Sequence, residues 1–195
     1  IAAGKIFMAK LIHTTILLLV FPAANAQFKY SLDQQIPVQD INGNNIAMPW
    51  TGGLNATQYN TMDLDSDGDE DLVLFDRMAN KVITFLNVDG AYAYHPEYES
   101  PFPEQLTNWL LLRDYNCDGL KDVFTGDILG IRVFKNTTAP GEQLSWEHYR
   151  FSTGSAGAKS DVLLTQGIEF KVNLQLQFDD LPAIVDADGD GDMDL

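Results

Sequence analysis

The sequence predicts an all-β fold built from repeated antiparallel sheets, for three reasons. An acidic loop motif occurs three times, at 63–72, 114–123 and 186–195. The first two copies are followed by short apolar runs rich in β-branched and aromatic residues, as strands are. Those two copies start about 50 residues apart, a spacing typical of propeller blades of three or four strands. We therefore expect a partial β-propeller of about two to three blades.

The elements are expected in the following order. A lead-in at 27–50 has two short strands, 28–36 and 41–49, broken at Asn42-Gly43, and a Gly-rich turn follows at 51–57. The strands around the first loop are predicted at 58–62, 71–76, 81–87 and 91–95. Those around the second loop are predicted at 108–113, 122–126, 131–136 and 144–151. The Gly/Ser/Ala-rich segment 152–160 is expected to be mobile, 161–178 to add strands, and 181–185 to enter the third loop.

Each loop has the residue pattern of a calcium site. Asp or Asn stands at positions 1, 3, 5 and 9, Gly at position 6 and an aliphatic residue at position 10. Calcium takes about six to eight oxygen ligands, and the glycine permits the sharp turn that lets alternate side chains converge. The carbonyl of position 7 and the carboxylate of position 9 complete the set. We expect up to three calcium ions, with these ligands: Asp63, Asp65, Asp67, Asp69, Asp71, Asp114, Asn116, Asp118, Leu120, Asp122, Asp186, Asp188, Asp190, Asp192 and Asp194.

Other interpretations of the loops fit less well. An EF-hand needs a bidentate Glu at position 12 between two helices, and dockerin-type loops also need an acid there. Position 12 is Leu74 in the first loop and Thr125 in the second, and the flanking segments are strand-like. Acidic turns without metal would not repeat the same five positions three times. The second loop has Asn116 where the others have Asp, so we expect it to be the weakest site.

Composition limits the classes of function. The chain has 195 residues, enough for one domain with its own core, and its net charge is -16. The loops hold 13 Asp and one Glu, which is half of the 28 acidic residues. This acidity argues against nucleic-acid binding, which needs a basic face. Cys117 is the single cysteine, so no intrachain disulfide is expected.

The N-terminus has the features of an export signal. A short basic region with Lys10 precedes the mostly apolar segment 14–21, and Ala24-Asn25-Ala26 offers small residues for cleavage after Ala26. The apolar segment is too short to span a membrane, and the alternative is a buried N-terminal helix. We expect 1–26 to be a signal peptide with an N-terminal extension, a true start at Met8 and a secreted or cell-surface protein. The end at Leu195, directly after the third loop, suggests a fragment of a longer chain.

At these residues the chain resembles the FG-GAP/VCBS repeat family, the integrin-α-like β-propellers, over about 50–195. The shared motif is Asp-x-Asp/Asn-x-Asp-Gly-x-x-Asp-Leu/Val followed by apolar strands. The chain is similar to the secreted members from Bacteroidetes-type bacteria at 52–55, 111–119 and 180–184. The resemblance implies structural calcium and a role in extracellular binding or cell adhesion, with a glycan or a surface protein as partner. The Phe-Gly and Gly-Ala-Pro element that names the family is not legible in this sequence.

Two functions are compatible with the sequence. The first is a non-enzymatic, calcium-stabilised scaffold for binding or adhesion. The alternative is a non-catalytic propeller part of a larger secreted polysaccharide-degrading enzyme. The catalytic candidates are His95, His148 and the pair Asp179-Asp180, together with three glutamates expected to be solvated in the Pro-rich connection, Glu97, Glu99 and Glu104. No nucleophile motif accompanies them, so no catalytic residue is predicted. The three tryptophans, Trp50, Trp109 and Trp146, are expected to pack in the core and not to stack on sugar rings.

Overall fold

The computed structural model describes residues 36–177, 180–190 and 193–194. The chain divides into two compact units, Ile1–Ile36 and Pro37–Leu195, and the features below belong to the second. In the described residues the regular structure is β-strand apart from one 3-10 turn, η1 (Pro96–Tyr98). No helix in this part of the chain is long and apolar enough to cross a membrane. The predicted signal peptide 1–26 and nearly all of the predicted strand 28–36 lie outside the described residues.

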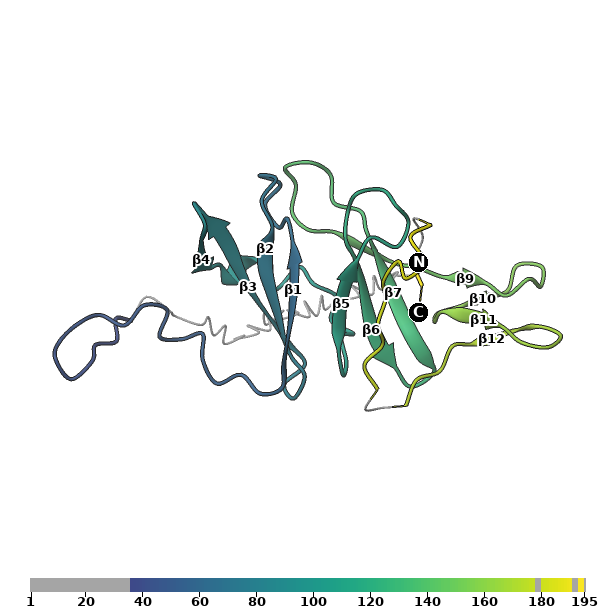
Figure 1. The fold of residues 1–195 in the computed structure, drawn as a ribbon, viewed down its shortest axis with the longest axis horizontal. Helices are drawn as coiled ribbons and strands as arrows, with labels where there is room; N and C mark the ends of the chain where they lie inside the picture. The colour runs from purple at the N-terminus through teal and green to yellow at the C-terminus, as the bar shows by residue number, and fades with distance from the viewer. Residues whose placement is uncertain (1–35, 178–179, 191–192, 195) are drawn as a thin grey trace, which may run out of the picture. The chain divides into compact units, whose positions relative to one another are not determined.

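Two four-stranded antiparallel sheets contain the first two loops (Figure 1). The first sheet consists of β1 (Thr57–Met62), β2 (Asp71–Asp76), β3 (Lys81–Val88) and β4 (Ala91–Tyr94). The second consists of β5 (Leu110–Arg113), β6 (Asp122–Asp127), β7 (Gly130–Asn136) and β8 (Trp146–His148). In both sheets the strands pair in chain order. The all-β prediction is confirmed, and the sheets do not close into a barrel within the described residues.

The two sheets share their register around the loops. Met62 pairs with Asp71 across the first loop, and Arg113 pairs with Asp122 across the second. The loop residue at position 9 therefore begins the second strand in each sheet. The later connections differ. The turn after the second strand spans 77–80 in the first sheet and 128–129 in the second, and the connection to the fourth strand spans 89–90 and 137–145.

Two smaller hairpins follow the second sheet. Strands β9 (Phe151–Ser152) and β10 (Lys159–Ser160) pair with each other, as do β11 (Leu164–Gln166) and β12 (Lys171–Asn173). The added strands at 161–178 are thus found, and the segment 152–160 forms the turn and the paired ends of the β9–β10 hairpin. Gly154 and Gly157, with φ of 88° and 76°, allow the chain to turn back there.

The predicted strand at 41–49 is reduced to a single bridge, and the segment 181–185 before the third loop also forms only one bridge. Gln39 pairs with Asn45 around a tight turn in which the Asp40 carboxylate accepts hydrogen bonds from the main-chain N–H of Asn42 and Asn44. This local acceptor competes with a strand ladder. Val185 bridges Asp194 on the other side of the third loop.

A shared hydrophobic core lies between the two four-stranded sheets. The first sheet contributes Val73, Phe75 and Leu86, and the second contributes Leu112 and Phe134. The opposite face of the second sheet is also apolar, with Phe124 and Val133 packed against Ile184, which precedes the third loop. A sheet apolar on both faces must be covered on both. The second sheet therefore lies between the first sheet and the chain that leads to the third loop.

Side-chain hydrogen bonds also join the sheets. The buried Asn60 amide of β1 donates to the carbonyl of Leu110 at 3.1 Å and accepts from the main-chain N–H of Leu112 at 3.1 Å. The Gln58 carbonyl oxygen accepts from the main-chain N–H of Leu110 at 2.9 Å. These amides satisfy the edge of β5 as a neighbouring strand would.

Replacing Asn60 by Asp is expected to lower the free energy of unfolding by about 2 to 3 kcal/mol, because a buried carboxylate would face the carbonyl of Leu110 without a donor. Urea unfolding measures the change. Asn173→Asp in β12 is the matched control and should lower the free energy by less than about 0.5 kcal/mol. Equal losses for the two variants would contradict the assigned inter-sheet role.

Candidate metal centre

The first two loops are tight connections between adjacent strands, with left-handed backbone at two positions. Gly68 and Gly119, at position 6, have φ of 94° and 88°, as predicted for the sharp turn. Position 4 is also left-handed, with φ of 65° at Ser66 and 58° at Cys117. In the third loop position 4 is Gly189, with φ of 79°. This glycine is the sequence signal for a left-handed backbone at position 4, and sequence reasoning did not use it. Gly191, at position 6 of the third loop, lies outside the described residues.

Carboxylates converge in the first and third loops. Asp63, Asp65 and Asp71 each place an oxygen within 4.8 Å of the others, and the third loop does the same with three carboxylates. That second set is Asp186, Asp188 and Asp190. Both sets offer oxygen and neither nitrogen nor sulfur, which is the ligand chemistry of a hard cation such as calcium. These two loops fit the predicted ion.

The carboxylate at position 1 organises the loop backbone. Asp63 accepts from the main-chain N–H of Ser66 at 2.7 Å and of Gly68 at 3.0 Å. Asp114 accepts from Asp118 at 3.1 Å and from Gly119 at 2.8 Å. These bonds hold the turn in the shape that brings alternate side chains together.

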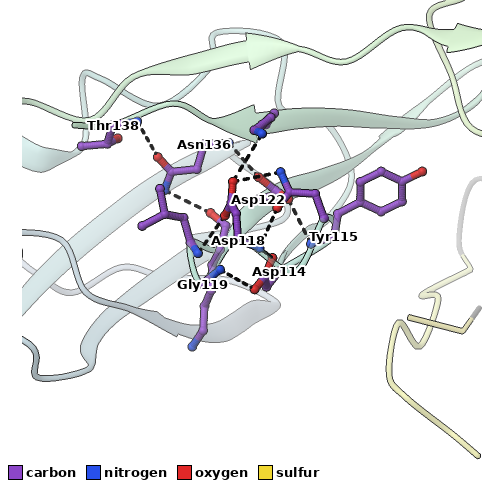
Figure 2. Close-up of polar contacts among 11 residues, drawn as sticks. Asp114, Tyr115, Asp118, Gly119, Asp122, Asn136 and Thr138 are labelled. Atoms are coloured by element: carbon purple, nitrogen blue, oxygen red, sulfur yellow. Dashed lines mark hydrogen bonds and ion pairs between the residues drawn. The ribbon is translucent and has the colours of Figure 1, made fainter. Parts of the chain in front are cut away.

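The carboxylate at position 9 joins each of the first two loops to the third strand of its sheet. Asp71 accepts from the main-chain N–H of Leu64 at 2.7 Å and of Asn87, in β3, at 2.8 Å. Asp122 accepts from Tyr115 at 2.9 Å and from Asn136, in β7, at 2.7 Å (Figure 2). Sequence reasoning assigned these aspartates only as ligands, because their strand partners lie far downstream.

In the third loop, Asp194 accepts from the main-chain N–H of Ala187 at 2.9 Å, the same bond from position 2 to position 9 as in the other loops. Asp192, predicted at position 7, lies outside the described residues. The other predicted position-7 residues, Asp69 and Leu120, are exposed, and their main-chain N–H groups donate to Asp67 and Asp118.

The second loop differs from the first because nitrogen donors surround one of its carboxylates. The Oδ2 atom of Asp118 lies 3.0 Å from the Asn116 amide nitrogen and 3.3 Å from the Lys135 ammonium. Its Oδ1 atom accepts from the main-chain N–H of Leu120 at 3.0 Å. In the first loop the Asp67 carboxylate accepts from the main-chain N–H of Asp69 at 2.9 Å, with no lysine beside it among the described residues. The carboxylates of the second loop do not form a three-oxygen cluster like the other two.

A lysine also links the first two loops. The ammonium of Lys121, at position 8, lies 2.6 Å from the carboxylate of Glu70 at position 8 of the first loop. It also donates to the carbonyl of Thr61 in β1 at 3.0 Å. The contact shows that the two loops lie at the same end of their sheets. Sequence reasoning missed it because its partners belong to different repeats.

Burial raises the pKa of Asp71 and of Asp122 above the ordinary value for a carboxyl, against the opposing effect of their main-chain donors. Above these raised pKa values the folded state holds buried charges at a cost. As the pH falls through them, the folded state binds protons before the unfolded state does, so stability rises. The gain ends once the unfolded carboxyls protonate near pH ~4.

Asp71 and Asp122 are therefore expected to contribute added stability to the calcium-depleted protein as the pH is lowered towards the pKa of an unfolded carboxyl, near pH ~4. Urea unfolding at a series of pH values measures this. The double variant Asp71→Asn/Asp122→Asn should lack this gain, so the stability of the wild type relative to the double variant should rise as the pH falls. A difference between the two proteins that does not change from pH 7 to about pH 4 would contradict the assigned pKa shifts.

The other sequence candidates have structural partners. His95 contacts Glu97 at 2.8 Å, and His148 contacts the carbonyl of Asp161 at 2.9 Å. Asp179 lies outside the described residues, so the pair with Asp180 is not described. Cys117 is exposed.

Two of the three tryptophans pack in the core and the third is exposed. Trp109 is 2% exposed in the core of the second sheet, and Trp146 packs against the shared core and the Phe102 ring, as predicted. The prediction is wrong for Trp50, which is 46% exposed because it lies in the lead-in before β1, outside both sheets.

Comparisons of the chain with protein-family models, with curated proteins and with solved structures found no match. The functional assignment therefore depends on the loops and sheets described above.

Proposed function

We propose that this chain is part of an exported calcium-binding repeat protein of the FG-GAP/VCBS type. In this proposal each four-stranded sheet is one blade of a partial β-propeller, and the third loop begins a further blade. The proposal is supported by the equal strand order of the two sheets and by the equal position of their loops. It is also supported by the apolar packing on both faces of the second sheet.

The observation that supports calcium most strongly is the clustering of three carboxylates in the first loop. Asp63, Asp65 and Asp71 bring their oxygens within 4.8 Å of one another. Such close negative charges repel each other unless a cation lies among them. Because Asp71 also holds the main chain of β3 through Asn87, an ion bound there would stabilise the sheet. We therefore assign calcium a structural role.

The scaffold is proposed to serve extracellular binding or adhesion without catalysis of its own. The partner class, a glycan or another surface protein, follows from the family resemblance alone. Secretion through a signal peptide cleaved after Ala26 belongs to the same proposal, because calcium is abundant outside cells.

Calorimetric titration of the calcium-depleted protein tests the metal assignment. We expect saturable calcium binding in the wild type and at least about tenfold weaker binding at the first loop in Asp65→Asn, which removes a clustered charge. Glu142→Gln removes an exposed charge outside the loops and should bind as the wild type does. Absence of calcium binding by the wild type at millimolar concentrations would falsify the assignment.

A further inference from the structure

The first and second loops have the same backbone plan but different neighbours on the third strand. Asn87 in β3 and Asn136 in β7 occupy equivalent places, since the main-chain N–H of each donates to the carboxylate at position 9. The residues before them are therefore also equivalent. They are Leu86 in the first sheet and Lys135 in the second. Leu86 is buried in the shared core, whereas Lys135 reaches Asp118 of its own loop.

The donors around Asp118 fill the oxygen that a cation would need. Asp118 Oδ2 has two principal lone-pair directions, and it lies within 3.0 Å of the Asn116 amide nitrogen and 3.3 Å of the Lys135 ammonium. An ammonium at this place offsets the negative charge of the loop carboxylates, as a metal ion would. It would also repel a calcium ion that approached the same carboxylate. Through both effects the second loop has less need of a calcium ion, and less affinity for one, than the first loop.

We propose that the Lys135 ammonium takes the place of a calcium ion in the second loop. The second loop then keeps its folded shape without calcium, while the first and third loops bind the ion. The inference rests on the proposed calcium function and adds a selection among the three loops. The loop of the second sheet then keeps its folded shape when calcium is removed. Only the loops on either side of it respond to calcium concentration.

The test is the number of calcium ions bound per chain, measured by equilibrium dialysis, in the wild type and in Lys135→Met. Methionine keeps most of the length of the lysine stem without its charge. The wild type is expected to bind two ions and Lys135→Met three, with the affinity of the second loop raised by about tenfold or more. Adding Asn116→Asp to Lys135→Met restores the fourth carboxylate and should tighten the third site further.

Two controls separate charge from folding. Lys135→Arg keeps the cation and should bind two ions, and Lys159→Met removes an exposed lysine far along the chain and should also bind two. Three ions in the wild type, or two in both Lys135→Met and the double variant, would overturn the role of Lys135 while leaving the calcium function intact. No ions in the wild type or in any variant would overturn both.

Discussion

Removal of calcium is expected to lower the free energy of unfolding by about 5 kcal/mol, the largest effect foreseen for this protein. An ion that binds only the folded state stabilises it by mass action, by about 2.7 kcal/mol for each site at a hundredfold excess over its Kd. Two loops, the first and the third, present three clustered carboxylates each. Their contributions to the free energy of unfolding add, because the first loop lies in the first sheet and the third loop lies beyond the second sheet.

For a chain of 195 residues this loss corresponds to a melting temperature lowered by about 10 to 20 °C. Thermal unfolding with calcium and with excess chelator measures it. Magnesium at the same concentration is the control and should restore much less stability, because it demands a smaller octahedral site and dehydrates reluctantly. Equal melting temperatures with calcium and with chelator would rule out a structural ion.

Replacing Asp122 by Ala is expected to lower the free energy of unfolding by about 3 kcal/mol, even without calcium. The Asp122 side chain is fully buried, and its two oxygens accept from the main-chain N–H groups of Tyr115 and Asn136. Truncation leaves both donors buried without a partner, and each such donor costs about 1 to 3 kcal/mol. The loop then loses its hydrogen bond to the main chain of β7 at Asn136.

Chelator is present throughout this measurement, so that any metal contribution is removed and urea unfolding reports the main-chain bonds alone. Asp69→Ala is the matched control, since Asp69 is exposed in the first loop and should change the free energy by less than about 0.5 kcal/mol. If Asp122→Ala does not fold, Asp122→Asn retains one acceptor oxygen and is expected to lose about 1 to 2 kcal/mol. Losses no larger than that of Asp69→Ala would contradict the anchoring role.

The strands of the two repeats could be predicted well because their signals are local. The run at 71–76 was predicted with the bounds that β2 has, and 81–87 differs from β3 by one residue. Gly68 and Gly119 marked the sharp turns, because few other residues adopt a left-handed backbone at low cost. Repetition strengthened each of these local signals, since the same pattern occurred after both loops.

The contacts that connect the second loop to β7 could not be predicted, because they join residues distant in sequence. The bond from Asn136 to Asp122 and the ion pair from Lys135 to Asp118 depend on the register of β7 against β6. A change of register by one residue would turn Lys135 to the other face of the sheet. Sequence reasoning ranked the second loop as weakest from Asn116 alone, and it did not foresee the lysine.

Calcium in the first loop is proposed to hold β1, β2 and β3 together through Asp71. Amide hydrogen exchange at Leu64 and Asn87, the two donors to Asp71, tests this claim most directly. In calcium both amides are predicted to exchange slowly, and chelator is predicted to speed their exchange far more than that of Tyr115 and Asn136 in the second loop. Identical exchange of Leu64 and Asn87 with calcium and with chelator would contradict the account.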